Sequence, residues 1–306
     1  MTKSSLTIGS HTLAWGERTY VMGILNITPD SFSGDGLLPL SAASDPVGTS
    51  AAVDAVVEIA RGFLSDGADI LDVGGESTRP GSQPVDASVE KQRVLPVIRA
   101  IAAGCPDALI SIDTWKADVV EEALVAGASI INDVWGLRLD PQLSVVAARA
   151  GVPVILMHNR SKPANVEVRE RLGKAYLGAE YENLLEDVKR DLMESVRIAR
   201  SAGIADEHIL LDPGIGFGKS IGQNLELINR LDELRALGYP VLLGASRKSF
   251  IGYTLDLPPD QRLEGTAAAI AVGITRGADI VRVHDVAVMV RVVRMTDAIV
   301  RPQKNA

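Results

Sequence analysis

The chain has 306 residues, of which 46% are apolar and 23% are charged, and its formal net charge at pH 7 is −8. This balance describes a globular protein with a substantial core, and it excludes a general nucleic-acid surface, which needs clustered Lys and Arg. Cys105 is the only cysteine, so the chain can form neither an internal disulfide nor a thiolate metal cage.

The N-terminal segment MTKSSLTIGSHTLAWGE lacks the run of about 7 to 15 apolar residues that a signal peptide carries. No other run reaches the roughly 18 apolar residues needed to span a membrane, so we expect a cytoplasmic protein. Residues 5–19 alternate weakly between apolar and polar side chains, which predicts a β-hairpin ahead of the main fold.

From residue 20 onward one pattern recurs: an amphipathic stretch, then a glycine, then a short β-branched run. A glycine just past a helix adopts a left-handed conformation without strain from a Cβ atom, so we expect each recurring glycine to end a helix. Each then leads into a strand, and YVMGILNI at residues 20–27 adds the first strand, which makes eight. The glycines are Gly67, Gly104, Gly127, Gly151, Gly203, Gly238 and Gly277.

Eight alternating strands and helices predict an α/β fold, a (β/α)8 TIM barrel with an N-terminal β-hairpin. An open, doubly wound sheet is the rival, but nothing in that fold favours eight repeats. We expect a single domain over residues 1–306, with the hairpin in 1–19 and the barrel in 20–300, because no change of composition marks a boundary. A final helix is expected after Asp285.

Polar side chains follow every predicted strand, whereas the opposite strand ends begin with Gly, Ala, Pro or Ile. One Asp or Asn after a strand is more often a cap than a catalytic group. Eight polar ends together indicate an active face, which barrels of this class place at the C-terminal ends of their strands. In chain order the residues are Asn26; Asp72, Glu76, Thr78 and Arg79; Asp113; Asn132 and Asp133; His158; Asp212; Arg247 and Lys248; Arg282 and His284.

The last two predicted strands end in basic residues. Arg282 and His284 are two residues apart, so they lie on the same side of the strand. Arg247, Lys248 and Ser249 follow the neighbouring strand, in the part of the mouth where such barrels often bind phosphate. We therefore expect an anionic ligand here.

Asp113, Asn132 and Asp212 end three other strands. A buried carboxylate can accept hydrogen bonds from both an amino group and an adjacent ring N–H, so these residues suit a flat guanine-like or pterin-like heterocycle. Metal ligation is the competing interpretation, but the scarcity of His and the spread over three strands disfavour a closed zinc site. A Mg²⁺ ion that bridges a pyrophosphate through one Asn oxygen stays open.

The segment GIGFGKS at residues 214–220 is similar to a phosphate-binding loop, but a Walker A motif needs Gly where this chain has Pro213. We reject that function and interpret the segment as a flexible loop whose missing side chains let a planar ligand approach the backbone. His158 is either a structural hydrogen-bonding residue or a ligand contact.

Eight motifs, in order and over roughly residues 20–300, resemble the dihydropteroate synthase family. The resemblance implies condensation of 6-hydroxymethyl-7,8-dihydropterin pyrophosphate with p-aminobenzoate to give 7,8-dihydropteroate and pyrophosphate, with Mg²⁺ as cofactor and sulfonamides as competitors of p-aminobenzoate. It also implies a homodimer that forms through late helices such as EGTAAAIAVGIT. The motifs are LNITPDSFSGDG, DVGGESTRPGS, SIDTWK, INDVWG, LMHNR, LDPGIGFGK, LLGASRKSFIG and RVHD.

The resemblance assigns roles residue by residue. It implies a pterin site made of Asp113, Asn132, Met157, Asp212, Phe217, Gly244 and Lys248. It implies a pyrophosphate site of Arg282, His284 and Asn26, with Mg²⁺ on Asn26, and places Thr78, Arg79, Pro80 and Ser249 on the pyrophosphate and p-aminobenzoate side, beside the Arg247 expected above.

LNITPDSFSGDG is interpreted as Asn26 followed by a lid. Phe32 and Asp35 lie in this lid and Pro80 in a second mobile loop, and the resemblance implies that both close over the substrates. Asp35 comes one step later in the chain than the acidic residue in the SFSDGG motif of many relatives.

The sequence leaves two alternatives open. A methyltetrahydrofolate methyltransferase-like barrel would share the ring site but handles no pyrophosphate, and the SRK and RVHD clusters argue against it. A catalytically silent pterin-binding paralogue would keep the same residues.

Overall fold

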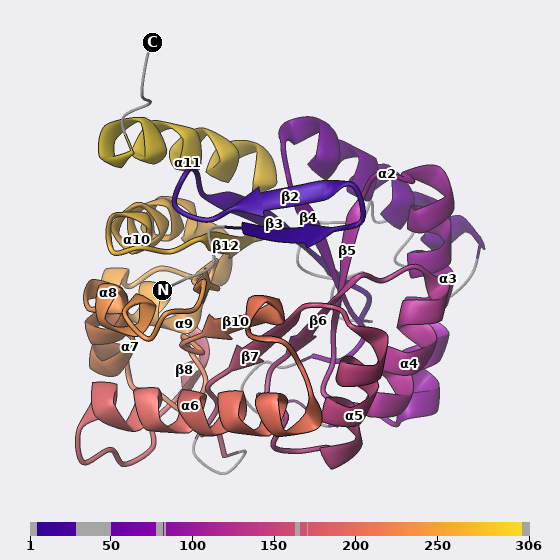
Figure 1. Cartoon of the computed structure of the whole chain (residues 1–306). Helices are drawn as coiled ribbons and strands as arrows, with labels where there is room; N and C mark the ends of the chain where they lie inside the picture. Colours follow the sequence, from indigo (N-terminus) through magenta and orange to yellow (C-terminus); the bar gives the residue numbers. More distant parts are fainter. Residues whose placement is uncertain are drawn as a thin grey trace.

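The computed structural model describes residues 5–28, 50–77, 82, 84–162, 166–169 and 171–301. Within these ranges, eight strands form one parallel sheet with helices around it (Figure 1). The strands match the eight expected from the sequence: β3 (Tyr20–Asn26), β4 (Ile70–Gly74), β5 (Leu109–Asp113), β6 (Ile130–Asp133), β7 (Val154–Met157), β10 (Ile209–Asp212), β11 (Leu242–Leu243) and β12 (Ile280–Val283).

The sheet closes into a barrel. Its hydrogen-bonded order is β10-β7-β6-β5-β4-β3-β12-β11, and an isolated parallel bridge between Leu211 and Val241 joins the two remaining edges. The predicted TIM barrel is therefore confirmed, with β11 as a short strand of only two residues.

Helices follow the strands and cover the outside of the barrel. Their apolar faces pack on the β-branched outer residues of the strands in one continuous core. No described helix is long and apolar enough to cross a membrane. The helices are α2 (Ser50–Asp66), α3 (Ala87–Gly104), α4 (Ala117–Ala126), α5 (Pro141–Ala150), α6 (Leu184–Ala202), α7 (Ile221–Asn229), α8 (Leu231–Arg235), α9 (Ser249–Leu255), α10 (Leu263–Thr275) and α11 (Val286–Val300), with short 3₁₀ turns η1 (Asp206–His208) and η2 (Pro259–Gln261).

The glycine pattern predicts the helix ends with one exception. Six of the seven glycines have positive φ, for example Gly127 at 121° and Gly203 at 97°. Gly104 instead is the last residue of α3, without a positive φ, and Cys105 closes that helix by donating its N–H to Ile101.

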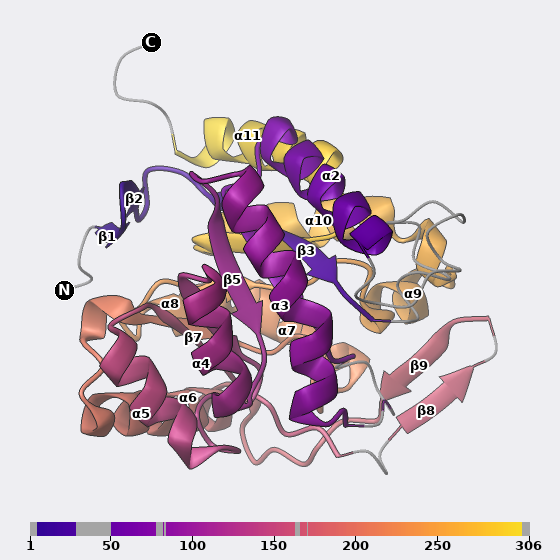
Figure 2. The ribbon, with the colours of Figure 1, turned by 90° about the vertical axis from the view of Figure 1, so that its right-hand side faces the viewer.

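The predicted N-terminal hairpin is confirmed as antiparallel β1 (Ser5–Ile8) and β2 (His11–Ala14). It lies at one end of the barrel, whereas a second hairpin, β8 (Val166–Arg169) and β9 (Gly173–Tyr176), lies at the other (Figure 2). The second hairpin falls in a connection for which the sequence predicts no element.

The first hairpin closes the N-terminal end of the barrel with apolar side chains. Every barrel strand contributes an inward residue to this layer, and Trp15 packs edge-on against Tyr20. Since the layer fills the bottom of the barrel, polar inward residues have room only at the C-terminal end. Its members are Leu6, Ile8, Leu13, Trp15, Tyr20, Met22, Ile70, Leu109, Ile130, Ile155, Leu210, Leu242 and Ile280.

Candidate active site

The two-residue period of the strands carries the chain from this apolar layer to a polar mouth. On β5, Leu109 belongs to the apolar layer, and Ser111 and Asp113 follow at steps of two, so all three side chains point inward. The same spacing from the apolar layer places Asp72, Asn132, Met157, Asp212, Gly244 and Arg282 in the mouth.

Arg282 lies between two carboxylates. Its Nε is 2.6 Å from Asp72 Oδ2, and its second terminal nitrogen is 2.6 Å from Asp113 Oδ2. Asn132 donates its amide N–H to the same Asp72 oxygen at 3.1 Å. The sequence predicts basic residues at one edge of the mouth and acidic residues at the other. This prediction is wrong for Arg282, because its guanidinium contacts two of the carboxylates directly.

Each of these two carboxylates has a second oxygen that can still accept a hydrogen bond. Oδ1 of Asp72 and Oδ1 of Asp113 are buried, and neither has a hydrogen-bond partner among the described residues. Burial raises the pKa of Asp113 to about 7, although the Arg282 guanidinium acts to lower it. A ligand that donates N–H groups to these oxygens would remove the cost of leaving them unpaired.

Asp212 and Lys248 form the opposite side of the mouth. Asp212 Oδ1 accepts a 2.7 Å hydrogen bond from the Gly214 N–H. Lys248 donates to the carbonyl of Ile215, and its Nζ lies 4.7 Å from the centre of the Phe217 ring. Burial lowers the pKa of Lys248 to about 8, with the Asp212 carboxylate opposing the shift.

Gly244 and Met157 line the wall between these groups. A Cβ atom on Gly244 would lie 3.7 Å from Lys248 Nζ and 3.9 Å from Asp212 Oδ2, so this glycine stands where the two charged groups meet. Met157 is buried at the end of β7, beside Asp212 in the parallel register. The predicted heterocycle residues therefore do share one mouth.

The remaining basic residues lie at the same end of the barrel but have protein partners. His284 Nδ1 is 3.0 Å from Ser246 Oγ. Arg247 has a positive φ of 54°, and its Nε lies 2.9 Å from Asp285 Oδ2. Ser249 is the first residue of α9.

Asn26 ends β3 and is half-buried, opposite Gly74 in the register with β4. Five predicted site residues lie outside the described part of the chain: Phe32, Asp35, Thr78, Arg79 and Pro80. In the ranges that are described, no group of three or more His, Cys, Asp or Glu side chains could hold a metal ion.

Some strand-end residues are structural. Asp133 accepts hydrogen bonds from the N–H groups of Trp135 and Leu137, so it caps a turn. Glu76 accepts hydrogen bonds from the Lys116 ammonium and from the N–H of Val85. The bond to Val85 joins the start of the β4–α3 connection to its end.

The sequence alone does not reveal three further contacts of the site. The pairing of Asp72 and the role of Ser246 beside His284 depend on three-dimensional proximity. The Ile215 carbonyl is a backbone group, for which a sequence carries no residue-type signal.

A barrel whose C-terminal mouth combines buried carboxylates, an amide and cations has the features expected of a pterin-binding enzyme. The family model of the pterin binding enzymes matches residues 22–284. A dihydropteroate synthase from Clostridium beijerinckii is 48% identical over 297 residues, covering 97% of this chain and 100% of that protein.

Solved structures agree. The Clostridium difficile dihydropteroate synthase, crystallised in the presence of pteroic acid, has a TM-score of 0.81 at 45% identity and covers 94% of this chain and 98% of its own. The Yersinia pestis enzyme with a sulfonamide drug has a TM-score of 0.83 at 38% identity, covering 96% and 98%. The chain belongs to the dihydropteroate synthase family.

Proposed function

We propose that this enzyme condenses 6-hydroxymethyl-7,8-dihydropterin pyrophosphate with p-aminobenzoate to give 7,8-dihydropteroate and pyrophosphate, a step of folate synthesis. One observation carries the proposal: Asp113 presents in the mouth, next to Arg282, a buried carboxylate oxygen that has no hydrogen-bond partner in the described part of the chain. Pteroic acid, present with the Clostridium difficile relative, contains both a pterin and p-aminobenzoate.

The pterin ring is proposed to lie between the two sides of the mouth. Asp113 and Asp212 accept N–H groups of the ring, and Asn132 fills the hydrogen-bonding position between them. Phe217 and Met157 offer apolar surface to the flat ring, and Gly244 leaves room for it. Lys248 donates from the side.

The diphosphate is proposed to lie on the other part of the mouth. Arg282 and His284 project from the end of β12, and Arg247, Lys248 and Ser249 come from the β11–α9 connection. Thr78, Arg79 and Pro80 are proposed for the side that receives p-aminobenzoate, and Phe32 and Asp35 for the lid, on the strength of the family motifs. A sulfonamide is proposed to compete there with p-aminobenzoate.

Asn26 is proposed to contribute one oxygen to a Mg²⁺ ion that the diphosphate also binds. The described residues fit this arrangement, because a single neutral amide at a half-buried strand end leaves most coordination positions to the ligand and water. When bound, the ion would neutralise charge on the departing diphosphate.

In the reaction, the C–O bond between the pterin methylene group and the diphosphate breaks, and the aniline nitrogen bonds to that carbon. The nitrogen then loses a proton, which has become acidic only after the bond forms. Arg282 and Lys248 stabilise negative charge on the departing diphosphate, while Asp113 and Asp212 favour positive charge on the ring. Excluding water protects the cationic carbon from hydrolysis.

The direct test is release of pyrophosphate that depends on both p-aminobenzoate and Mg²⁺. In the same assay, Asn26→Ala should reduce turnover with Mg²⁺ present by about tenfold or more, because one metal ligand is lost. Equal turnover of Asn26→Ala and the native enzyme would refute the assignment of Asn26. Release without p-aminobenzoate would mean hydrolysis rather than condensation.

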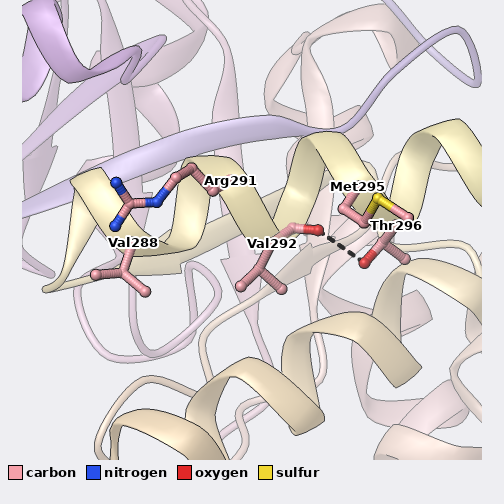
Figure 3. Close-up of a pocket in the computed structure, with 5 residues that line it drawn as sticks. All are labelled: Val288, Arg291, Val292, Met295 and Thr296. Atoms are coloured by element: carbon pink, nitrogen blue, oxygen red, sulfur yellow. Dashed lines mark hydrogen bonds between the residues drawn. The ribbon is translucent and has the colours of Figure 1, made fainter.

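We also propose a homodimer that forms through α10 and α11. A hollow of about 370 Å³ lies along α11, and Figure 3 shows Val288, Val292 and Met295 along it, with Thr296 hydrogen-bonded to the Val292 carbonyl. Met295 is 63% exposed and Ile299, four residues later on the same face of α11, is 67% exposed, so adjoining large apolar side chains are exposed on this face.

Light scattering after size-exclusion chromatography tests the dimer. Met295→Glu should shift the mass from two chains towards one, because the substitution would bury a charge in an apolar interface. Val125→Glu on α4, where Val125 is 86% exposed, is the control that should leave the mass unchanged. An unchanged mass for both variants would exclude this face.

A further inference from the structure

Lys219 is a buried lysine that the proposed chemistry does not use. It ends the connection between β10 and α7 and is only 2% exposed. Its ammonium lies 2.9 Å from His158 Nδ1, 2.9 Å from the Gly214 carbonyl and 3.1 Å from the Phe217 carbonyl. A fourth acceptor, the His158 carbonyl, lies at 3.5 Å, so every N–H donor of this nitrogen has a partner.

The surroundings of Lys219 favour a fixed hydrogen-bonding role over catalysis. Among the described residues no carboxylate pairs with its ammonium. Burial lowers the pKa of His158 to about 3, and Lys219 adds to this effect, so the ring is neutral and can accept at Nδ1. His158 Nε2 lies 3.2 Å from Asp191 Oδ2.

The connection that Lys219 closes, residues 213–219, is pressed against the segment that follows β7. A Cβ atom on Gly214 would lie 1.9 Å from the His158 carbonyl oxygen, and one on Gly218 would lie 2.4 Å from the Arg160 carbonyl carbon. The glycines therefore permit contact between two stretches of protein backbone. The expectation of a flexible loop is wrong for these residues, because they are packed.

The same connection shapes one side of the mouth. Its Gly214 N–H binds Asp212, its Ile215 carbonyl accepts from Lys248, and its Phe217 ring lies beside the Lys248 ammonium. Lys219 binds the carbonyls of Gly214 and Phe217, the residues that bracket Ile215. Movement of those carbonyls would displace the partners of both Asp212 and Lys248.

We propose that Lys219 is a positioning residue that joins the β10–α7 connection to His158 and so sets the places of Asp212, Phe217 and Lys248 for the pterin ring. This inference rests on the function proposed above. The residue that gives GIGFGKS its likeness to a phosphate loop thus points inward to carbonyls and an imidazole, and acts on the heterocycle side of the site.

The test compares Lys219→Met, which keeps chain length but removes the three donors, with Lys91→Met, which removes a surface lysine paired with Glu122 on the outer helices. Binding of 6-hydroxymethylpterin is measured by its fluorescence, and KM is measured separately for the two substrates. We expect Lys219→Met to raise the pterin Kd and the pterin KM by about tenfold or more. The KM for p-aminobenzoate and all constants of Lys91→Met should stay within about twofold.

A purely structural role would give a different result. The melting temperature of Lys219→Met would fall, while the pterin Kd and both KM values, measured well below that temperature, would match those of the native enzyme; this would overturn the inference. An equal rise of both KM values would also overturn it, because the effect would then not be confined to the pterin side.

A milder pair of variants keeps the inference testable if Lys219→Met does not fold. His158→Asn can place its side-chain oxygen near the position of Nδ1, whereas His158→Leu offers no acceptor. We expect the pterin Kd to rise in His158→Leu and to be restored largely in His158→Asn; equal values in the two would contradict the role of the Lys219 contact. Failure of the proposed function is distinguishable, since the native enzyme itself would then neither bind pterin nor release pyrophosphate.

Discussion

Arg282 bridges Asp72 and Asp113, two carboxylates on the neighbouring strands β4 and β5. Its guanidinium bonds to Asp72 and Asp113 with separate nitrogens, so its planar fork matters as well as its charge. Both acids are buried, and removing their shared cation would leave two uncompensated charges close together. The residue therefore contributes to stability as well as to the proposed binding of diphosphate.

Substituting Arg282 should reveal both contributions. Arg282→Met is expected to destabilise the fold by about 3 kcal/mol, because it leaves the buried carboxylates without their partner. Arg282→Lys restores the charge but cannot reach both acids in the same geometry, so stability should recover in part and turnover should stay low. Urea denaturation and pyrophosphate release measure the two effects, and full activity in Arg282→Lys would contradict a need for the fork.

Asp113 should make pterin binding depend on pH. Its raised pKa means that the folded protein holds the proton more tightly than the unfolded chain does. As the pH falls through about 7 the carboxylate that accepts ring N–H groups is lost, so the pterin Kd should rise. Asp113→Asn should bind pterin weakly at pH 8, and its Kd should rise less between pH 8 and pH 6.

The same shift has a consequence for stability, with a definite sign. A raised pKa contributes stability that is complete below the unfolded value near 3.8 and is lost as the pH rises through about 7. At pH 8, Asp113→Asn should therefore melt at a higher temperature than the native enzyme, and the difference should shrink towards pH 5. A constant difference at all pH values would show that Asp113 is not the responsible group.

At the scale of elements, the β10–α7 connection is the part of the mouth with the closest backbone packing. Three of its residues, Gly214, Gly216 and Gly218, have positive φ, and each stands where a side chain would meet protein atoms. The segment is thereby fixed between the end of β7 and the side chain of Lys248. A substitution within it should affect stability and the pterin site together.

Gly214→Ala tests this packing. We expect a loss of about 2–4 kcal/mol, because φ is +66° and the new Cβ would meet the His158 carbonyl. Gly62→Ala is the matched control: Gly62 lies inside α2 with nothing within 4 Å of a Cβ, so a gain of about 0.5–1 kcal/mol is expected. Similar stabilities for the two variants, measured by urea denaturation, would contradict the account.

The elements could be predicted from the sequence to different extents. Seven of the eight strands follow from β-branched runs after glycines, and the first follows from the apolar run YVMGILNI; both signals are local. The β8–β9 hairpin gave no such signal, since VEVR and GKAY are short and half polar. The contacts within the site are harder to predict. Arg282 and Asp72 are 210 positions apart, and the pairing of β12 with β3 and of β3 with β4 brings them together.

At the scale of the whole molecule, the two ends of the barrel have different roles: one stabilises the fold and the other carries the proposed site. The hairpin and the inward residues at the starts of the strands form an apolar layer, and the inward residues at the ends of the strands form the proposed site. The sequence predicts which end is polar, because polar residues follow the C-terminal end of each strand. It does not predict which acid pairs with which cation, since the period of a strand gives direction but not the neighbour across the barrel.

Damage to the apolar end should lower stability without changing the site. Leu13→Ala in the hairpin is expected to cost about 2–4 kcal/mol, because Leu13 is only 4% exposed and the substitution leaves a cavity in the apolar layer. Both KM values should stay within about twofold of native at temperatures well below melting. A selective rise in the pterin KM would show that the two ends are coupled.

The seam of the barrel runs beside the proposed pterin site. Among the described residues one bridge, Leu211 with Val241, joins β10 to the two-residue strand β11, whereas β10 pairs with β7 over four residues and β11 with β12 over two. Asp212 is the last residue of β10, and Lys248 precedes α9 in the connection that follows β11. A pterin that binds both residues would link β10 to the β11–α9 connection across this short pairing. Ligand binding should therefore slow amide exchange at Leu242 and Leu243 more than at any residue of β4 or β5.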